Sequence, residues 1–296
     1  MSSPHPHHHH HHHHQLVIGT RLHLLNASAP PEAEYFRDLQ EKFSAFASSC
    51  NAEHAYVAVD STPRFPNYCL EDVIRTLASA LLDSNSLPLQ IIPVTPWNAF
   101  TPALNAIASR AAQDGASLCL FCSAETRASP ESIQILLQHM MDENNNVLVA
   151  GAVLPGHDYH KNSIQPLSGV TSPWNTLAVW DVAKLTLIGF PLVADGLHTH
   201  IGDEDGLARR APAGVEEVSA IAVLQHLFGG AEHARAKLVP LMPDTVQWDR
   251  EFSSRTATTT QEERLNWHDF KMKSKVERPA VHLKLLNLKD GLVEHC

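Results

Sequence analysis

Short runs of β-forming residues alternate with amphipathic helical patterns along the first half of the chain. The β-forming runs are Leu16–Gly19, Ala55–Val59, Leu89–Val94, Leu118–Cys122 and Val147–Leu154. Between them, apolar residues recur three and four positions apart, which is the spacing of one face of a helix. Because parallel strands need a crossover between them, this order predicts an α/β fold with a mostly parallel sheet and helices on both faces.

The composition is that of a folded chain, because 44% of the 296 residues are hydrophobic and a sizeable core is expected. The formal net charge is −10, which argues against general nucleic-acid binding, since that needs a basic face. Five cysteines without a framework of spacings predict reduced thiols. The sequence shows no signal peptide and no apolar run that would span a membrane, and we therefore expect a cytoplasmic protein.

Three segments are predicted along the chain. Residues 1–14 contain a histidine run, which we interpret as a purification tag or a low-complexity tail and exclude from functional reasoning. Residues 15–155 carry the alternating pattern, and residues 156–296 are less regular. We expect the last two segments to be halves of one domain.

The stretch Ser117–Pro130 is the most informative part of the chain. Its apolar run Leu118–Cys122 ends abruptly in a polar turn that contains Glu125. A helix signal follows at once, with Ser129 as the N-cap and Pro130 at the first helical position. Open α/β sheets present polar groups at the carboxyl ends of their strands in this way, so we expect the chemistry at this edge. The two cysteines of the run are expected to be buried core thiols.

Four predicted strands end in polar residues, at the edge where ligands lie in such sheets. These ends are Thr20-Arg21, Asp60-Ser61, Thr95-Pro96-Trp97 and Ser123-Ala124-Glu125. An acid such as Asp60 suits a base or a ribose hydroxyl, whereas Arg21, or the backbone donors at a helix start such as Thr101, suits a phosphate. One such end alone is merely a turn, but four in succession favour a ligand site.

The order of these motifs resembles the family-2-type glycosyltransferases, which have the GT-A fold, a Rossmann-like sheet with helices on both faces. The family's successive motifs look like Thr20, Asp60-Ser61, Asn105 within TPALNAIASRA, Ser123-Ala124-Glu125 and Pro130. The later segment GVEEVSAIAVLQHLFGG is similar to the family's Glu-Asp helix, and NTLAVWDVAKLTLIGFP looks like its acceptor-side segment. The resemblance covers Leu16 to Leu241, in pattern more than in identity.

This resemblance implies a glycosyltransferase that moves a sugar from a nucleotide-diphosphate sugar to an acceptor hydroxyl, with inversion. The absence of a Gln-x-x-Arg-Trp motif indicates a non-processive enzyme. The match makes Glu217, beside Glu216, the base that deprotonates the acceptor. It makes residues 15–155 the nucleotide-sugar-binding half and residues 156–296 the acceptor-binding and catalytic half with a helical tail. The implied nucleotide-sugar-binding residues are Thr20, Arg21, Asp60, Ser61, Asn105, Ser123 and Glu125.

The resemblance also implies a divalent cation, but the family's Asp-x-Asp motif is here Ser-Ala-Glu, which leaves one carboxylate. We therefore expect Mg²⁺ or Mn²⁺ to bind weakly at Glu125, with help from the nucleotide. His268 is a candidate second ligand, because the family often places a late histidine there. An ordinary surface histidine is the competing interpretation.

The acceptor-site candidates are Trp97, Trp174 and Asn175, because apolar sugar faces stack on aromatic rings. Core packing is the alternative for the tryptophans, and Trp180 is expected in the core. Two other functions stay open. One is a catalytically degenerate relative that acts as a binding or scaffold module. The other is a nucleotidyltransferase, against which the single glycine of GTRLHLLN counts. The acidic loop from His198 to Asp205 is expected to be solvated.

Overall fold

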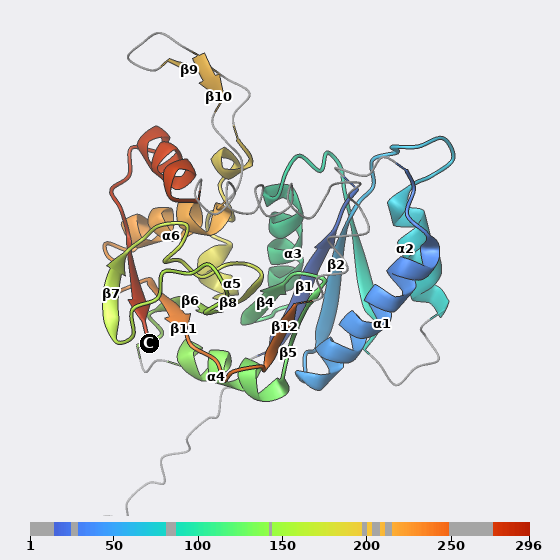
Figure 1. The fold of residues 1–296 in the computed structure, drawn as a ribbon, viewed down its shortest axis with the longest axis horizontal. Coiled ribbons are helices and arrows are strands. Elements are labelled where there is room, and N and C mark those ends of the chain that lie inside the picture. Colours follow the sequence, from blue (N-terminus) through green and yellow to red (C-terminus); the bar gives the residue numbers. More distant parts are fainter. Residues whose placement is uncertain are drawn as a thin grey trace, which may run out of the picture.

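The computed structural model describes residues 15–24, 29–80, 87–141, 144–196, 200–202, 208–210, 215–248 and 275–296. For 200–202, 208–210 and 248 it describes the backbone alone. A nine-stranded sheet forms the centre of the fold, and helices cover both of its faces (Figure 1). Within the described ranges, no helix combines the length and the apolar character that crossing a membrane requires.

The central sheet is mixed but mostly parallel. Its order is β3 (Leu89–Val94), β2 (His54–Asp60), β1 (Leu16–Leu22), β4 (Leu118–Cys122), β8 (Leu177–Asp181), β6 (Val147–Ala152), β11 (Arg235–Val239), β13 (Leu292–His295) and β7 (Ser163–Pro166). Only β8 and β7 run antiparallel to their neighbours. All five strands predicted from the sequence lie in this sheet and run in one direction, which confirms the expected α/β fold.

Two small antiparallel sheets accompany the central one. The first pairs β9 (His200–Gly202) with β10 (Ala208–Arg210), and the second pairs β5 (Thr126–Ala128) with β12 (Val246–Trp248). The β5–β12 pair follows directly after β4 and therefore holds the turn that contains Glu125 near the edge of the central sheet.

Each face of the sheet packs against its own set of helices. Apolar residues of α1 (Ala33–Ser49), α2 (Leu70–Ala80) and α4 (Pro130–Met140) share one core with the strands. The opposite core contains residues of α3 (Thr101–Gln113), α5 (Val182–Leu185) and α6 (Glu216–Leu227). A short 3₁₀ helix covers Leu192–Asp195, and residues 275–285 are helical before β13 (drawn in red in Figure 1).

Local signals in the sequence explain where α4 begins. The hydroxyl oxygen of Ser129 accepts a hydrogen bond from the backbone N–H of Ser132 at 3.2 Å, so the predicted N-cap is confirmed. The preceding strand β4 is fully buried, and burial raises the pKa of both Cys119 and Cys122, as expected for core thiols.

Strand β8 is the main departure from the expected fold. It lies in the stretch from Trp174 to Phe190, to which the sequence analysis assigned no strand. All five residues of β8 are buried, and the strand inserts antiparallel between β4 and β6. Trp180 on this strand lies in the core, as expected. A strand of the second half of the chain therefore separates two strands of the first half.

Candidate functional site

The carboxyl ends of β1 and β4 enclose a small cavity next to α3. Its volume is about 30 Å³. The lining residues are Gly19, Thr20, Arg21, Leu104, Ile107, Phe121, Cys122, Ser123, Asn175 and Thr176. Gly19 lets α3 approach, because a Cβ atom there would collide with the side chain of Ile107. A cavity needs roughly 10–15 Å³ of such volume to hold one water molecule, so this cavity has room for a small polar group such as a water molecule or a hydroxyl.

Three polar groups on the wall of this cavity are buried and make no hydrogen bond to another described residue, although the one on Arg21 has an ion pair with Glu216. They are Oγ1 of Thr20, Nη1 of Arg21 and Nδ2 of Asn175. Thr20 is 3% exposed and Asn175 is 5% exposed. A buried polar atom without a partner costs about 1–3 kcal/mol, and native proteins seldom gather several in one place. All three groups are able to donate, so the cavity suits a ligand atom that accepts hydrogen bonds.

Two adjacent carboxyl groups lie beside the cavity at the start of α6. They belong to Glu216 and Glu217, which are 5% and 6% exposed. Glu217 Oε1 accepts a hydrogen bond from the backbone N–H of Asn175 at 2.6 Å. Glu216 Oε1 lies 3.4 Å from Nη1 of Arg21. Each acid is therefore tied to a residue that lines the cavity.

The backbone immediately before this acid pair is strained. Val215 has φ 64° and ψ 47°, which is the left-handed region. A β-branched residue adopts this conformation rarely and at a cost in free energy. Val215 is also buried, so its side chain is packed in this position. Helix α6 therefore begins with a strained turn at the residue that precedes both acids.

The surroundings of Glu217 raise its pKa towards neutral pH. Burial raises the pKa of Glu217 from 4.5 to about 7, and the neighbouring charge of Glu216 acts in the same direction. The hydrogen bond from Asn175 and the positive charge of Lys275 oppose this rise in the pKa. A carboxyl group that titrates near pH 7 is suited to take up and release a proton during a reaction.

The charges of two basic residues of the 275–285 helix act on this acid pair. The Nζ atom of Lys275 lies 2.9 Å from the centre of the Trp174 ring. Trp174 directly precedes Asn175 in the chain. Burial lowers the pKa of Arg278, and the charges of Glu216 and Glu217 raise it. Neither Lys275 nor Arg278 was predicted from the sequence, because the charged residues of the C-terminal tail carry no pattern that indicates which of them lie near the acid pair.

The predicted residues at the end of β2 interact mainly with the chain itself. Asp60 is 1% exposed. Its Oδ2 accepts hydrogen bonds from Nε and Nη2 of Arg64 at 3.1 and 3.0 Å, and its Oδ1 accepts one from the N–H of Thr62 at 3.0 Å. The hydroxyl of Ser61 makes a short hydrogen bond with that of Thr95. Neither Asp60 nor Ser61 lines the cavity.

Asn105 and the start of α3 are also engaged within the chain. Nδ2 of Asn105 donates to the carbonyl of Phe190 at 3.0 Å, and its Oδ1 accepts from the N–H of Phe190 at 2.7 Å. The carboxylate of Asp195 accepts hydrogen bonds from the N–H groups of Phe100 and Thr101 at 2.9 and 2.8 Å. The backbone donors that suggested phosphate binding at this helix start are therefore occupied by a carboxylate of the same chain.

The remaining donor-side candidates differ in position. Ser123 lines the cavity, and its hydroxyl pairs with that of Thr126 at 2.6 Å. Glu125 is half-buried in the turn after β4 and does not line the cavity. Thr20, Arg21, Ser123 and Asn175 are thus the predicted residues that the fold gathers around one cavity, with Glu216 and Glu217 beside it.

The aromatic acceptor-site candidates are both buried. Trp97 packs in the core beside His23, with ring centres 5.7 Å apart. The ring of Trp174 is contacted by Lys275 and by the His157 ring, whose centre lies 3.7 Å away. Its indole N–H donates to the carbonyl of Gly169 at 2.8 Å. Both rings are therefore surrounded by protein groups in this conformation.

The described residues do not assemble a ligand set for Mg²⁺ or Mn²⁺. No three His, Cys, Asp or Glu side chains in this part of the chain are placed to hold one ion together. Glu125 supplies a single carboxylate at the motif, whereas these ions prefer several oxygen ligands. His268 lies outside the described residues.

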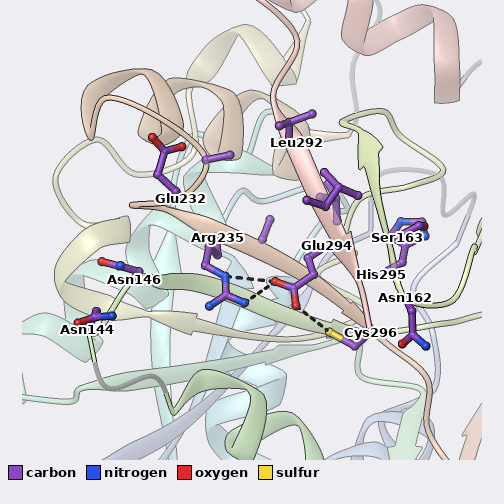
Figure 2. A pocket seen from close by; sticks show the side chains of 14 residues that line it. Asn144, Asn146, Asn162, Ser163, Glu232, Arg235, Leu292, Glu294, His295 and Cys296 are labelled. Carbon is purple, nitrogen blue, oxygen red and sulfur yellow. Dashed lines mark hydrogen bonds and ion pairs between the residues drawn. The ribbon is translucent and has the colours of Figure 1, made fainter.

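A larger hollow, with a volume of about 790 Å³, lies along β11, β13 and β7 (Figure 2). At the centre of this hollow, Nε and Nη2 of Arg235 donate hydrogen bonds to the carboxylate of Glu294 at 3.1 and 2.5 Å. None of the described residues that line it has a buried polar side-chain atom without a partner, and none is a predicted site residue. Volume alone favours this hollow, but the unpartnered donors and the acid pair favour the smaller cavity as the candidate site.

Comparisons with known proteins give matches at the level of structure. No protein-family model and no curated protein matches the sequence. One similar structure is glucosyl-3-phosphoglycerate synthase from Mycobacterium tuberculosis in complex with phosphoglyceric acid. Its TM-score is 0.44 at 11% identity, over 82% of this chain and 75% of that chain. Another is 4-diphosphocytidyl-2C-methyl-D-erythritol synthase from Anaerococcus prevotii, with a TM-score of 0.43 at 9% identity, over 81% of this chain and 93% of that one.

A third similar structure is a fragment of TarS from S. aureus, residues 1–349. Its TM-score is 0.39 at 14% identity, and the match covers 60% of this chain. This chain spans half of the TarS fragment. All three TM-scores lie below 0.5, so the function proposed below is drawn from the residues of the site itself.

Proposed function

We propose that this protein is a glycosyltransferase that moves a sugar from a nucleotide-diphosphate sugar to an acceptor hydroxyl, with inversion and without processive polymerisation. One observation carries the proposal. The donor groups of Thr20 and Asn175, which have no hydrogen-bond partner among the described residues, line one cavity together with the Arg21 guanidinium, and the carboxyl groups of Glu216 and Glu217 lie beside it. Buried donors suit the oxygen atoms of a donor sugar or phosphate, and a buried acid suits proton transfer.

In this proposal Glu217 is the general base. Its carboxylate takes the proton of the acceptor hydroxyl as that oxygen attacks the anomeric carbon, and the bond from this carbon to the diphosphate breaks. The backbone N–H of Asn175 holds Glu217 Oε1 at 2.6 Å and so fixes the direction of the carboxylate. Glu216 has a different role, because its carboxylate pairs with Arg21 and positions that guanidinium at the cavity.

A second candidate function is a non-catalytic binding module of the same fold. The pairing of Asp60 with Arg64 favours it, because that pair occupies a carboxylate that would otherwise face a ribose or a base. A nucleotide-binding module and a transferase share the donor site, but only the transferase needs a base.

Nucleotide binding is the first test. A thermal-shift panel of UDP, GDP and CDP and their sugars, with and without Mn²⁺, should contain at least one compound that raises the melting midpoint, since a ligand specific for the folded state stabilises it. No shift with any compound at millimolar concentration would contradict the donor-site proposal.

The base is tested by Glu217→Gln, with the donor and acceptor found by such screening. We expect the variant to keep nucleotide binding and to lose ~10²-fold or more in transfer rate, as removal of a positioned base should. Glu216→Gln should cost less, and Glu232→Gln, on the exposed surface, serves as the control. A Glu217→Gln variant with wild-type transfer would exclude this base, and binding without transfer in the wild type would favour the binding module.

A further inference from the structure

Residues 171–175, here called the site segment, lead directly into the candidate site. The last of them, Asn175, donates its backbone N–H to Glu217 and is one of the residues that line the cavity. A histidine from a distant strand binds the first of them. Nε2 of His295, on β13, donates a hydrogen bond to the carbonyl of Thr171 at 3.1 Å (His295 is labelled in Figure 2). The site segment is therefore tied to the central sheet by an imidazole ring.

Both ring nitrogens of His295 have backbone partners. Nδ1 accepts a hydrogen bond from the N–H of His160 at 3.0 Å, while Nε2 faces the carbonyl of Thr171. Because an N–H only donates and a carbonyl only accepts, this arrangement requires the neutral ring with its proton on Nε2. A second proton would lie on Nδ1, directly against the N–H of His160. The residue is fully buried, so water does not replace either partner.

A second histidine binds the next carbonyl of the site segment. Nε2 of His157, in the loop between β6 and β7, donates to the carbonyl of Ser172 at 3.0 Å, and its Nδ1 accepts from the N–H of Leu154 at 2.8 Å. This ring tolerates a second proton better than that of His295 does, because the carbonyl of Leu154 lies 3.1 Å from Nδ1 and can accept a hydrogen bond there. His295 is therefore the histidine whose hydrogen bonds exclude the charged form.

The surroundings of His295 also favour its neutral form. The titratable side chains of the described residues that face it lie in the loop between β6 and β7, and they are His157, Asp158, Tyr159 and His160. Burial lowers the pKa of His295, and the neighbouring His160 acts in the same direction. The hydrogen bond to Thr171 and the carboxylate of Asp158 oppose this change without cancelling it. As the pH falls, a solvated histidine therefore takes up a proton before the buried one does.

We propose that His295 is a positioning residue for Asn175 and an acid-sensitive lock on the site segment. The neutral ring joins β13 to Thr171 and keeps the segment in place. When Nδ1 takes up a proton from the solvent, it no longer accepts from His160, so the ring leaves its site and the carbonyl of Thr171 loses this donor. The segment then loosens, and Asn175 moves with it. The proposal goes beyond the proposed function, since it applies to a transferase and to a binding module alike.

Hydrogen exchange of the ligand-free protein at pH 5 and pH 7, measured by mass spectrometry, tests this proposal. After correction for the intrinsic chemical rate, peptides of the site segment should exchange about tenfold faster or more at pH 5, because a solvated histidine with a pKa of about 6.5 is almost fully protonated there. Peptides of β4 serve as the internal reference and should show no such acceleration.

Two variants show whether His295 is responsible. His295→Gln keeps an N–H donor for Thr171 but cannot titrate, so its corrected rates at the two pH values should agree within about twofold. His233→Gln is the matched control, because it removes an exposed histidine, and it should behave as the wild type does.

Three outcomes would overturn the proposal: equal corrected rates at both pH values in the wild type, the same acceleration in His295→Gln, or an equal acceleration in β4, which would mean that the whole fold is lost. Should His295→Gln fail to fold, NMR of the ¹⁵N-histidine-labelled wild type provides the second measurement. His295 should be neutral with its proton on Nε2 at pH 6.5, where an ordinary histidine is half protonated. A charged ring, or a proton on Nδ1, would contradict the proposal and leave the proposed function in place.

Discussion

The buried carboxyl group of Glu217 makes folding stability depend on pH. Its pKa is raised from 4.5 to about 7 in the folded chain. Between these values the folded chain binds more protons than the unfolded chain, so this residue lowers stability as the pH rises through that window. Replacement by glutamine removes the penalty. We subtract the melting temperature of the wild type from that of Glu217→Gln at each pH. This difference should be larger at pH 8 than at pH 5 by about 3 °C or more.

Thermal denaturation at both pH values measures this difference. Glutamine keeps an acceptor oxygen for the N–H of Asn175, so the hydrogen bond seen at Glu217 is retained in the variant. Glu232→Gln, on the exposed surface, should show no such pH dependence. An equal difference in melting temperature between Glu217→Gln and wild type at both pH values would mean that Glu217 in the folded chain is ionised from pH 5 to pH 8.

Asn105 gives a second prediction at the scale of single residues. Its amide satisfies both backbone groups of Phe190, at 3.0 and 2.7 Å, so Asn105→Leu would leave two buried polar groups without partners. We expect a loss of about 1–3 kcal/mol in the free energy of unfolding, with nucleotide affinity retained. Denaturant unfolding and a nucleotide titration measure the two quantities. Loss of affinity at unchanged stability would instead support the nucleotide-binding role that the family resemblance implies.

At the residue scale, the sequence indicated part of the site. The polar strand ends placed Thr20, Arg21 and Ser123 at one edge, because parallel strands end together. The ion pair of Arg21 with Glu216, and the effect of the two glutamates on the pKa of Arg278, join segments that are far apart in the chain. No local pattern encodes such contacts, so the positive side of the site was not predictable.

At the element scale, the 275–285 helix depends on a close contact with the loop before β8. Because a Cβ atom at position 169 would meet the carbonyl of Lys275, Gly169→Ala should displace the start of this helix without changing any charge. We expect a lower melting temperature and weaker nucleotide binding. A variant that melts lower but binds UDP, GDP and CDP as the wild type does would show that this helix only supports the fold.

The elements that the sequence predicted are those with local signals. Helix α4 has its cap at Ser129 and a proline at its first position, and it begins where expected. Strand β8 carries no alternation of polar and apolar residues, because it is buried on both faces. A short apolar run of that kind is compatible with a helix or a strand until its neighbours in the sheet are known.

At the scale of the whole molecule, the two sequence halves share one sheet. Strand β6 pairs only with β8 and β11 in the described structure, and both belong to the second half. Residues 15–155 alone would leave β6 unpaired and expose its buried side chains. We therefore expect this fragment to aggregate or to lack a cooperative thermal transition. Near-UV circular dichroism of the purified fragment, with the intact chain as control, measures this, and a sharp transition would show that the first half folds independently.

The strained backbone of Val215 predicts that selection for stability and selection for sugar transfer favour different residues at position 215. Glycine or asparagine adopts a left-handed backbone at lower cost than valine, so either would favour yield of folded protein. A looser turn would hold Glu216 and Glu217 less firmly, which selection for sugar transfer would disfavour. A library of all residues at position 215, sorted once for survival of heating and once for transfer, should therefore enrich different amino acids. The same residues enriched in both sorts would mean that the strain at Val215 contributes nothing to turnover.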